Sequence, residues 1–414
     1  MNSMGQLLCV GIVLTLVSGC GVINALKMRS ANDDIEPRWT ASASEVALKA
    51  HYEGEKPYID IAINGIDGFR FLIDTGASIS ILTDSPRVRA LGLQAGFELP
   101  MSGWGDEQGS RAYQTQVDSV DFGPFQMEKL NLAYIPVGST PYFADPREVI
   151  FDGVLGYDVL RHFRWTFEKQ QRRITVANTP VEVESGDVAL PLDTFMTRIS
   201  VDAEFNVGDG QWRKEPILID TGSRHVLKLS ALYLRNRDID PGVTVQGGDF
   251  GLSGLAEHQR MRLEGLRLGT LEVNNLRTHL IETEDEDELW VIGSALLGHY
   301  TTIIDYFSEQ MILRTSSQQT PFQSRFNLLG LELRKLSDGR FIVRYVMPNL
   351  PASAAGVQAG DIVTTLNGQS TPDISTDAWL SITNTPGNHA LCLEKRGCLS
   401  LQATTIAGYS MPSG

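Results

Sequence analysis

The sequence predicts a mainly β protein made of two matched halves and a smaller C-terminal domain. The triplet Asp-Thr-Gly occurs at residues 74–76 and again at 220–222, each time at the end of an apolar run. Short strand-like segments separated by turn residues fill both halves, as in an all-β domain. A polar segment at residues 316–321 then precedes a C-terminal region with a different pattern. We therefore expect two lobes related by a pseudo-twofold axis, followed by a third domain.

The chain begins with a targeting segment. Residues 7–17 are apolar, and this stretch is too short to span a bilayer as a helix. It ends in Leu-Val-Ser-Gly-Cys, with Cys20 as the cysteine, which resembles the lipobox of bacterial lipoproteins. The first six residues carry no Lys or Arg, which departs from that pattern, so a plain secretory signal with a chance cysteine is the alternative.

The lipobox resemblance implies a signal peptide over residues 1–19, lipidation of Cys20 and a linker over residues 20–44. It also implies a lipid-anchored protein of the bacterial cell envelope that faces the periplasm. Gly21 after the cysteine is typical of lipoproteins sent to the outer membrane.

The two halves align well beyond the triplets. Asp220 lies 146 residues after Asp74, and the same offset places Val117–Gly123 on Leu263–Gly269 with apolar positions matched. It also places Trp104 and Gly105 on Phe250 and Gly251, inside two glycine-rich stretches that we interpret as hairpins. Further on, Leu155-Gly156 is matched with Leu297-Gly298. A repeat of this length indicates a duplicated domain, and we expect one lobe over residues 45–182 and the other over 183–317.

Composition restricts the partners. The 414 residues suffice for two or three domains, and the net charge of −15 argues against nucleic acid and anionic membrane surfaces as partners. The seven histidines are scattered and no Cys/His grouping has zinc-site spacing, so we expect neither a metal nor a cofactor. Cys392 and Cys398 flank a predicted hairpin turn and can form a disulfide in an oxidising compartment, with two free thiols as the alternative.

Residues 45–315 resemble a retropepsin-like aspartic protease with two lobes fused in one chain. The resemblance rests on the two Asp-Thr-Gly triplets, on the segments Val154-Leu155-Gly156 and Leu296-Leu297-Gly298, and on the two hairpins as a pair of flaps. It implies that Asp74 and Asp220 form a catalytic dyad. Two carboxyl groups held close together cannot both ionise easily, so they share a proton and activate a water molecule. The sequence leaves open which aspartate is protonated.

The residues beside each aspartate have expected roles. The hydroxyls of Thr75 and Thr221 are expected to bond across the lobes. The glycines at 76 and 222 let the backbone approach the carboxylates without a Cβ in the way. We expect the hydroxyl of Ser223 to donate a hydrogen bond to Asp220 and so to favour its ionisation.

Further residues are expected to line the cleft. By the same resemblance, Ser78 and Arg224 lie beside the substrate backbone. Arg224 then favours acidic substrate residues, or alternatively pairs with a local carboxylate. Trp104, Gly105, Phe250 and Gly251 are flap-tip candidates, and the alternative is that the two aromatic side chains pack on their own lobes.

The C-terminal region, residues 318–414, resembles a bacterial PDZ domain. The resemblance rests on Leu350–Val363 and on the segment Leu366-Asn367-Gly368. It implies that Leu329, Gly330 and Leu331 form a loop that binds the carboxylate of a peptide C-terminus, or that an exposed strand is bound beside it. The alternative is a PDZ fold that serves only as a docking brace for the protease.

Together these features predict an aspartic endopeptidase that acts on periplasmic or envelope proteins, with PDZ-assisted substrate recognition. The expected partners are protein or peptide substrates, a PDZ ligand and the membrane through the lipid anchor. The main alternative is an inactive, peptide-binding envelope adaptor. A serine hydrolase is disfavoured because no G-x-S-x-G segment is present.

Overall fold

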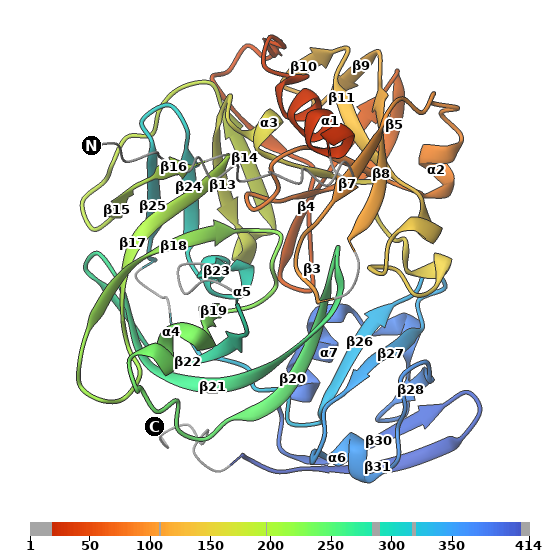
Figure 1. The fold of residues 1–414 in the computed structure, drawn as a ribbon, viewed down its shortest axis with the longest axis vertical. Helices are drawn as coiled ribbons and strands as arrows, with labels where there is room; N and C mark the ends of the chain where they lie inside the picture. The colour runs from red at the N-terminus through yellow and green to blue at the C-terminus, as the bar shows by residue number, and fades with distance from the viewer. Residues whose placement is uncertain (1–18, 107–108, 196, 284–289, 317–319, 407–414) are drawn as a thin grey trace, which may run out of the picture.

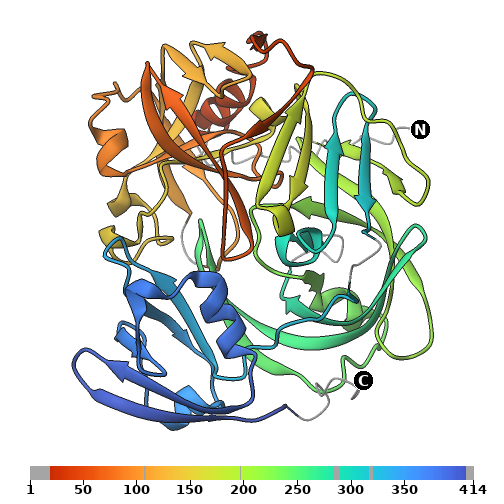
Figure 2. The same ribbon diagram turned by 180° about the vertical axis from the view of Figure 1, so that it is seen from behind.

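The computed structural model describes residues 19–106, 109–195, 197–283, 290–316 and 320–406. Four β-sheets make up most of this part of the chain: one for each lobe, one between the lobes and one in the C-terminal domain (Figures 1 and 2). Residues 1–18 of the predicted signal peptide and the C-terminal tail from residue 407 lie outside the described residues. Among the described residues, no helix has both the length and the apolar character needed to cross a membrane.

The first lobe is an eleven-stranded sheet with the strand order β1-β10-β9-β4-β5-β12-β6-β11-β8-β7, and β3 pairs with β4. Its strands are β1 (Arg38–Trp39), β3 (Ala50–Glu53), β4 (Lys56–Ile63), β5 (Ile66–Ile73), β6 (Ile81–Thr83), β7 (Glu98–Met101), β8 (Ser110–Gln116), β9 (Ser119–Asp121), β10 (Phe125–Glu128), β11 (Asn131–Ile135) and β12 (Gly153–Leu155). Its short helices are α2 (Pro86–Arg89), α3 (Tyr157–Leu160) and the 3-10 turns η1 (Val137–Ser139) and η2 (Pro146–Glu148).

The segment expected to be a linker is ordered against the first lobe. It contains helix α1 (Gly19–Ser30) and strand β1. Met28 is buried, and the amide of Asn32 donates hydrogen bonds to Asp158 Oδ2 at 2.8 Å and to the carbonyl of Asn131 at 2.9 Å. The helix begins at residue 19, so the predicted lipidation site Cys20 lies in its first turn.

A six-stranded sheet joins the lobes and takes three strands from each half. The first half gives β2 (Glu45–Leu48), β13 (Arg164–Glu168) and β14 (Arg173–Ala177), with η3 (Lys169–Gln171) between the last two; the second gives β15 (Val188–Pro191), β24 (Thr301–Asp305) and β25 (Gln310–Arg314). The junction is the antiparallel pair β13–β24, where Trp165 faces Ile304 and both side chains are buried. This shared sheet fixes the two lobes relative to each other.

The second lobe is an eight-stranded sheet with the order β16-β17-β18-β23-β19-β22-β21-β20. Its strands are β16 (Asp193–Phe195), β17 (Arg198–Asn206), β18 (Arg213–Asp220), β19 (Leu227–Ser230), β20 (Val245–Gly251), β21 (Gly254–Leu268), β22 (Leu271–Ile281) and β23 (Val291–Gly293), with helices α4 (Ala231–Asn236) and α5 (Ser294–Leu297). Strand β18 pairs in parallel with β23, as β5 pairs in parallel with β12 in the first lobe.

This pairing corrects the end of the sequence repeat. The segment Val154-Leu155-Gly156 packs beside the first triplet, and its counterpart beside the second is Val291-Ile292-Gly293, because Ile292 pairs with Ile219 and Gly293 with Asp220. The segment Leu296-Leu297-Gly298 that we had matched instead ends helix α5, where Gly298 is the C-cap. The β-branched residues 291–292 were the signal for this buried strand.

The C-terminal domain is a six-stranded sheet with its own core around Phe341 and Trp379. Its elements are β26 (Leu331–Lys335), β27 (Phe341–Val346), α6 (Pro351–Ala354), β28 (Ile362–Leu366), β29 (Gln369–Ser370), η4 (Thr371–Asp373), α7 (Thr376–Thr383), β30 (Gly387–Leu393) and β31 (Gly397–Ala403). Cys392 and Cys398 form a disulfide between β30 and β31. The domain lies beside β20 of the second lobe and below the first lobe in Figure 1.

Candidate active site

The two Asp-Thr-Gly triplets meet where the lobes face each other. Each threonine hydroxyl donates to a carbonyl of the opposite lobe: Thr75 to Ile219 at 2.6 Å, and Thr221 to Ile73 at 2.8 Å. Each hydroxyl also accepts from the backbone N–H of the other threonine, at 3.1 Å in both directions. Four reciprocal hydrogen bonds, all buried, therefore hold the two loops in a symmetric arrangement, as predicted for the threonines.

The glycines of the triplets face the carboxyl groups of the opposite lobe. A Cβ atom on Gly76 would lie 2.8 Å from Asp220 Cγ, and one on Gly222 would lie 2.2 Å from Asp74 Cγ. Both distances are far below van der Waals contact. The two loops can therefore approach each other this closely only with glycine at positions 76 and 222. Each glycine lies against the aspartate of the opposite loop.

The dyad is electrostatically asymmetric. Burial, followed by the charge of Asp220, raises the pKa of Asp74 to about 8, while Lys56 and the N–H of Gly76 oppose that shift. The coupled pair therefore holds one shared proton at neutral pH.

Backbone N–H groups hold the carboxylates in place. The N–H of Gly76 donates to Asp74 Oδ1 at 2.8 Å, and the N–H of Ser223 donates to Asp220 Oδ1 at 2.9 Å. The Ser223 hydroxyl is buried and makes no hydrogen bond among the described residues. The expectation that this hydroxyl donates a hydrogen bond to Asp220 was therefore wrong. The backbone N–H of Ser223 donates instead, and the direction of that N–H depends on the turn and not on the side chain.

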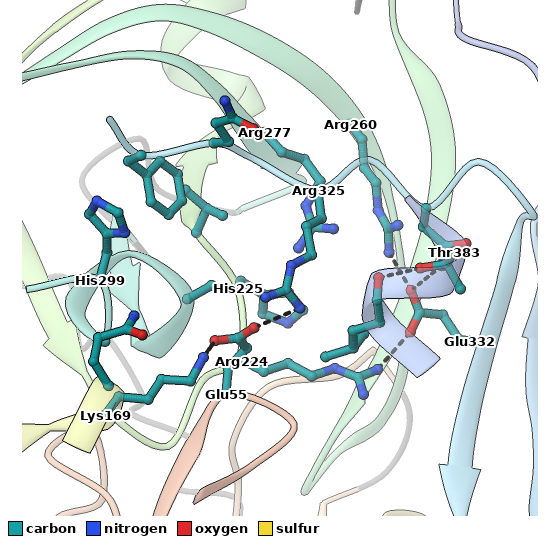
Figure 3. A pocket seen from close by; sticks show the side chains of 18 residues that line it. Glu55, Lys169, Arg224, His225, Arg260, Arg277, His299, Arg325, Glu332 and Thr383 are labelled. Atoms are coloured by element: carbon teal, nitrogen blue, oxygen red, sulfur yellow. Dashed lines mark hydrogen bonds and ion pairs between the residues drawn. The ribbon is translucent and has the colours of Figure 1, made fainter. Parts of the chain in front are cut away.

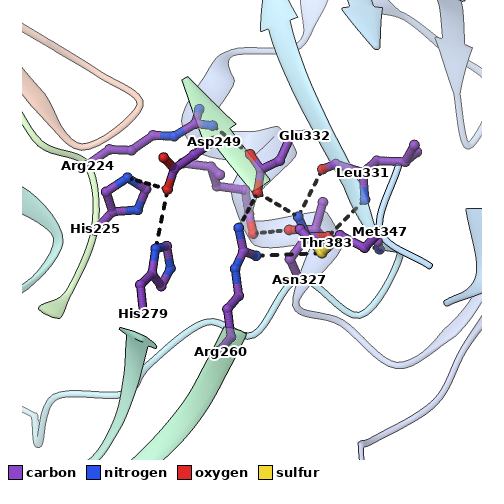
Figure 4. A network of polar contacts seen from close by, with 12 residues as sticks. Arg224, His225, Asp249, Arg260, His279, Asn327, Leu331, Glu332, Met347 and Thr383 are labelled. Atoms are coloured by element: carbon purple, nitrogen blue, oxygen red, sulfur yellow. Dashed lines mark hydrogen bonds and ion pairs between the residues drawn. The ribbon is translucent and has the colours of Figure 1, made fainter. Parts of the chain in front are cut away.

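Arg224 does not point into an open substrate site. Its guanidinium forms an ion pair with Glu332 of strand β26 at 2.6 Å. The alternative prediction, that Arg224 pairs with a carboxylate, is therefore confirmed, although this carboxylate belongs to the C-terminal domain. Arg260 of β21 also pairs with Glu332, at 2.9 Å (Figure 4). Ser78 is half-buried in the loop that follows the first triplet. Lobe 2 and the C-terminal domain are thus joined four residues after Asp220.

The two predicted flaps meet at their tips. The flap of the first lobe is the loop after β7 with Trp104 and Gly105, and the flap of the second is the β20–β21 hairpin with Phe250 and Gly251. The N–H of Ser253 donates to the carbonyl of Trp104 at 3.0 Å, and the N–H of Asp106 donates to the carbonyl of Leu255 at 2.9 Å. These hydrogen bonds run between the lobes, so the two flap tips are joined to each other.

The flap aromatics do not pack on their own lobes. The Trp104 indole N–H donates to Asp249 of the other lobe, and its ring lies 3.6 Å from Lys228 Nζ, measured to the ring centroid. Phe250 is covered by Arg344 of the C-terminal domain, whose Cζ lies 4.0 Å from the ring centroid. Gly105 and Gly251 permit this contact, because a Cβ on either would lie within 2.3 Å of the opposite flap's backbone.

A basic cavity of about 130 Å³ lies between the second lobe, residues 320–327 and the C-terminal domain (Figure 3). Glu55 and Glu332 are its acidic lining residues, and Leu380 and Thr383 of α7 close one side. Its basic lining residues are Lys169, Arg224, Arg260, Arg277 and Arg325. Burial, followed by the charge of Arg260, lowers the pKa of Arg277 to about 9.

The loop predicted to bind a peptide carboxylate is closed by the chain itself. The carboxamide oxygen of Asn327 accepts hydrogen bonds from the N–H groups of Gly330 at 3.1 Å and Leu331 at 3.4 Å (Figure 4). Leu329 and Leu331 are both fully buried. In this arrangement the predicted PDZ site does not offer these N–H groups to a ligand. Asn327 was the signal, because asparagine readily bonds the backbone a few residues ahead.

The C-terminal domain also binds the first lobe. Arg334 and Arg344 both pair with the buried carboxylate of Glu148 in η2, the former at 3.1 Å. Thr376 Oγ donates to Glu53 at 2.7 Å. With the pairs at Glu332, these contacts attach the domain to both lobes at once.

Sequence reasoning missed a cluster beneath the flaps. His225, His258 and His279, which look scattered in the sequence, lie together around Asp249 in the second lobe. Three of these residues, His225, Asp249 and His279, place ligand atoms within 4.8 Å of one another. Strand pairing brings them together, because β20 and β22 both flank β21.

Comparisons with known proteins agree with this description. Residues 59–159 match the sequence model of the aspartyl protease family, and residues 320–394 match that of the PDZ domain. Among solved structures, the aspartic proteinase from Irpex lacteus is similar at 12% identity with a TM-score of 0.43, over 67% of this chain and 98% of that one. No curated protein matches. Residues 59–159 of this mainly β, two-lobed chain are thus similar to the aspartyl protease family, and residues 320–394 are similar to PDZ domains.

Proposed function

We propose that the protein is an aspartic endopeptidase that hydrolyses peptide bonds with a water molecule activated by Asp74 and Asp220. The observation that carries this proposal is the opposed carboxyl pair, in which the pKa of Asp74 is raised to about 8 by burial and by Asp220. One protonated and one ionised carboxyl group are what acid–base hydrolysis by water needs.

In this mechanism every proton transferred by the dyad is returned, and no covalent intermediate forms. The oxygen of the water molecule attacks the peptide carbonyl carbon while Asp220 accepts a proton from that water. At the same time Asp74 donates its proton to the carbonyl oxygen. The resulting gem-diol collapses when Asp220 returns its proton to the leaving nitrogen and Asp74 takes one from a gem-diol hydroxyl. The dyad then has its starting protonation, and the products are a carboxylic acid and an amine.

Entry of a substrate requires the flaps to separate. The cross-lobe hydrogen bonds between residues 104–106 and 253–255 have to break, and a closed flap then excludes water from the reaction. The substrates are proteins or peptides, the partner class that protease and PDZ domains imply. In this proposal the PDZ domain positions a substrate only after Asn327 releases Gly330 and Leu331.

The location belongs to the proposal as well. The lipobox-like segment ending at Cys20 supports a lipid-anchored protein of the bacterial envelope, with envelope or periplasmic proteins as substrates. Mass spectrometry of the mature N-terminus tests it: a diacylglyceryl group on Cys20 is expected, and an unmodified Cys20 would contradict it.

A peptide library tests the proposed activity. We expect the full chain in detergent to cut peptides between pH 3 and 9, and expect Asp74→Asn and Asp220→Asn each to abolish every cut. Asp118→Asn is the control, because Asp118 is exposed in the first lobe. Cleavage that persists in either dyad variant would overturn the proposal. Peptide capture without products by the wild type would favour a binding-only cleft instead.

A further inference from the structure

The cluster beneath the flaps brings metal-ligating groups from separate segments to one point. Asp249 comes from β20, His279 from β22 and His225 from the loop that follows the second Asp-Thr-Gly triplet. All three are buried, with exposed fractions of 2% for Asp249, 1% for His279 and 8% for His225. Neither the proposed dyad chemistry nor the PDZ fold uses them.

The contacts within the cluster are close but are not ordinary hydrogen bonds. Asp249 Oδ2 lies 2.9 Å from His225 Nε2 and 3.3 Å from His279 Nδ1 (Figure 4). Nevertheless, Asp249 Oδ2 and both ring nitrogens of His279 lack a hydrogen-bond partner of acceptable geometry among the described residues. Buried polar atoms that are left unpaired are costly, so this arrangement calls for another binding partner.

We propose that His225 Nε2, Asp249 Oδ2 and His279 Nδ1 bind one divalent transition-metal ion, for which zinc is the best fit. Bonds of about 2.0–2.2 Å to nitrogen and oxygen at tetrahedral angles separate the ligand atoms by roughly 3.3 Å. The two separations from Asp249 Oδ2, 2.9 Å and 3.3 Å, are near that value. Two imidazoles and a carboxylate are also a ligand set suited to zinc, with water as the fourth ligand.

The surroundings favour this use of the residues. The rings of His225 and His279 are both buried, and an imidazole binds a metal in its neutral form. The other carboxylate oxygen of Asp249 accepts the Trp104 indole N–H, which orients the ligand.

His258 is placed as a neighbour of the site and not as a ligand. Its Nδ1 lies 3.2 Å from the carbonyl of Ala256, and its Nε2 accepts from Arg260 at 3.2 Å. Its ring stacks on that of His279 with centroids 4.2 Å apart. His258 therefore fixes the orientation of a proposed ligand, while its own nitrogens are engaged.

Bound metal would act on the flaps. It would tie β20 to the loop after Asp220, and through the Asp249–Trp104 hydrogen bond it would also hold the flap of the first lobe. The site thus stabilises the closed flap pair by metal ligation, a role independent of whether the dyad cuts peptides.

The test measures metal binding directly. The full chain is stripped with EDTA, loaded with ZnCl₂, desalted and assayed by elemental analysis, with His279→Gln and Asp249→Asn beside it. We expect about one zinc ion per chain in the wild type, with loss of zinc in both variants and a rise in melting temperature on loading only in the wild type. His162→Gln, in the first lobe, is the matched control and should bind zinc like the wild type.

Cobalt gives a second readout that needs no variant. Co²⁺ in a tetrahedral nitrogen–oxygen site absorbs visible light strongly, so titration of the stripped wild type should give these bands and excess zinc should remove them. The proposal is overturned if the wild type retains only substoichiometric zinc and gives no bands, or if folded His279→Gln binds as much zinc as the wild type. None of these readouts depends on proteolysis.

Discussion

At the scale of single residues, the Asp-Thr-Gly triplets were predictable because each one is a local motif whose partner is its own copy. The sequence therefore identified both aspartates, both threonines and both glycines. It did not identify the support of Asp220, because a backbone N–H of Ser223 provides it and the side chain does not. Nor could it show that burial and the neighbouring carboxyl group raise the pKa of Asp74.

The threonine hydrogen bonds give a prediction at this scale. Thr221→Ala removes a hydroxyl that donates to Ile73 and accepts from the N–H of Thr75, so two buried backbone groups lose partners. Each buried backbone group left without a hydrogen bond costs roughly 1–3 kcal/mol. Because the structure around the two groups partly relaxes, we expect the free energy of unfolding to fall by about 2–4 kcal/mol in total. Thr221→Ser keeps the hydroxyl and is the control. Equal stability of the alanine and serine variants in urea titrations would contradict this account.

At the scale of elements, the sequence repeat correctly matched the two flap hairpins with each other. It did not predict which residues their tips contact. That contact depends on the closing of one lobe on the other, which involves residues 150 positions apart, such as Gly103 and Ser253. The same limit explains the mismatch after β12. The connections to the last strand of each lobe differ in length, so matching Leu155-Gly156 with the next Leu-Gly pair placed Gly298 where Gly293 lies.

Trp104→Phe tests the flap contact. The substitution keeps a ring beside Lys228 but removes the indole N–H that Asp249 accepts. We expect faster hydrogen–deuterium exchange at residues 249–255, because the flaps open more often. Trp39→Phe is the matched control, since the Trp39 indole N–H donates to Ala43 far from the flaps. Unchanged exchange at Ser253 in Trp104→Phe would show that this hydrogen bond does not hold the flaps.

At the scale of the whole molecule, the order of the domains was predictable from the sequence, but their docking was not. The PDZ resemblance implied a peptide-binding loop, with a docking brace as the alternative, and did not predict that Glu332 of β26 binds Arg224 and Arg260 of the second lobe. Long-range ion pairs of this kind leave no local pattern, since each partner resembles a solvated charge in the sequence. The closed loop at Asn327 and these pairs thus show a PDZ domain docked on the second lobe with its loop occupied by the chain itself.

Glu332→Gln tests the docking. It leaves two arginines facing an uncharged amide at a buried contact, and we expect the free energy of unfolding to fall by about 3 kcal/mol. We also expect proteases to cut near residues 316–321 more rapidly. Glu394→Gln is the control, because the Arg340–Glu394 pair is exposed within the PDZ domain and should contribute under about 1 kcal/mol. Equal proteolysis of the two variants would argue against docking through Glu332.

The shared proton of Asp74 and Asp220 should control the pH dependence of kcat/KM for a peptide found in the library screen. Asp74 must be protonated to donate to the carbonyl oxygen, and its pKa is raised to about 8 by burial and by Asp220. We therefore expect kcat/KM to fall as the pH rises through about 8 and the shared proton is lost. Activity that increases through pH 8, as expected of a nucleophile that must first lose a proton, would contradict the shared-proton dyad.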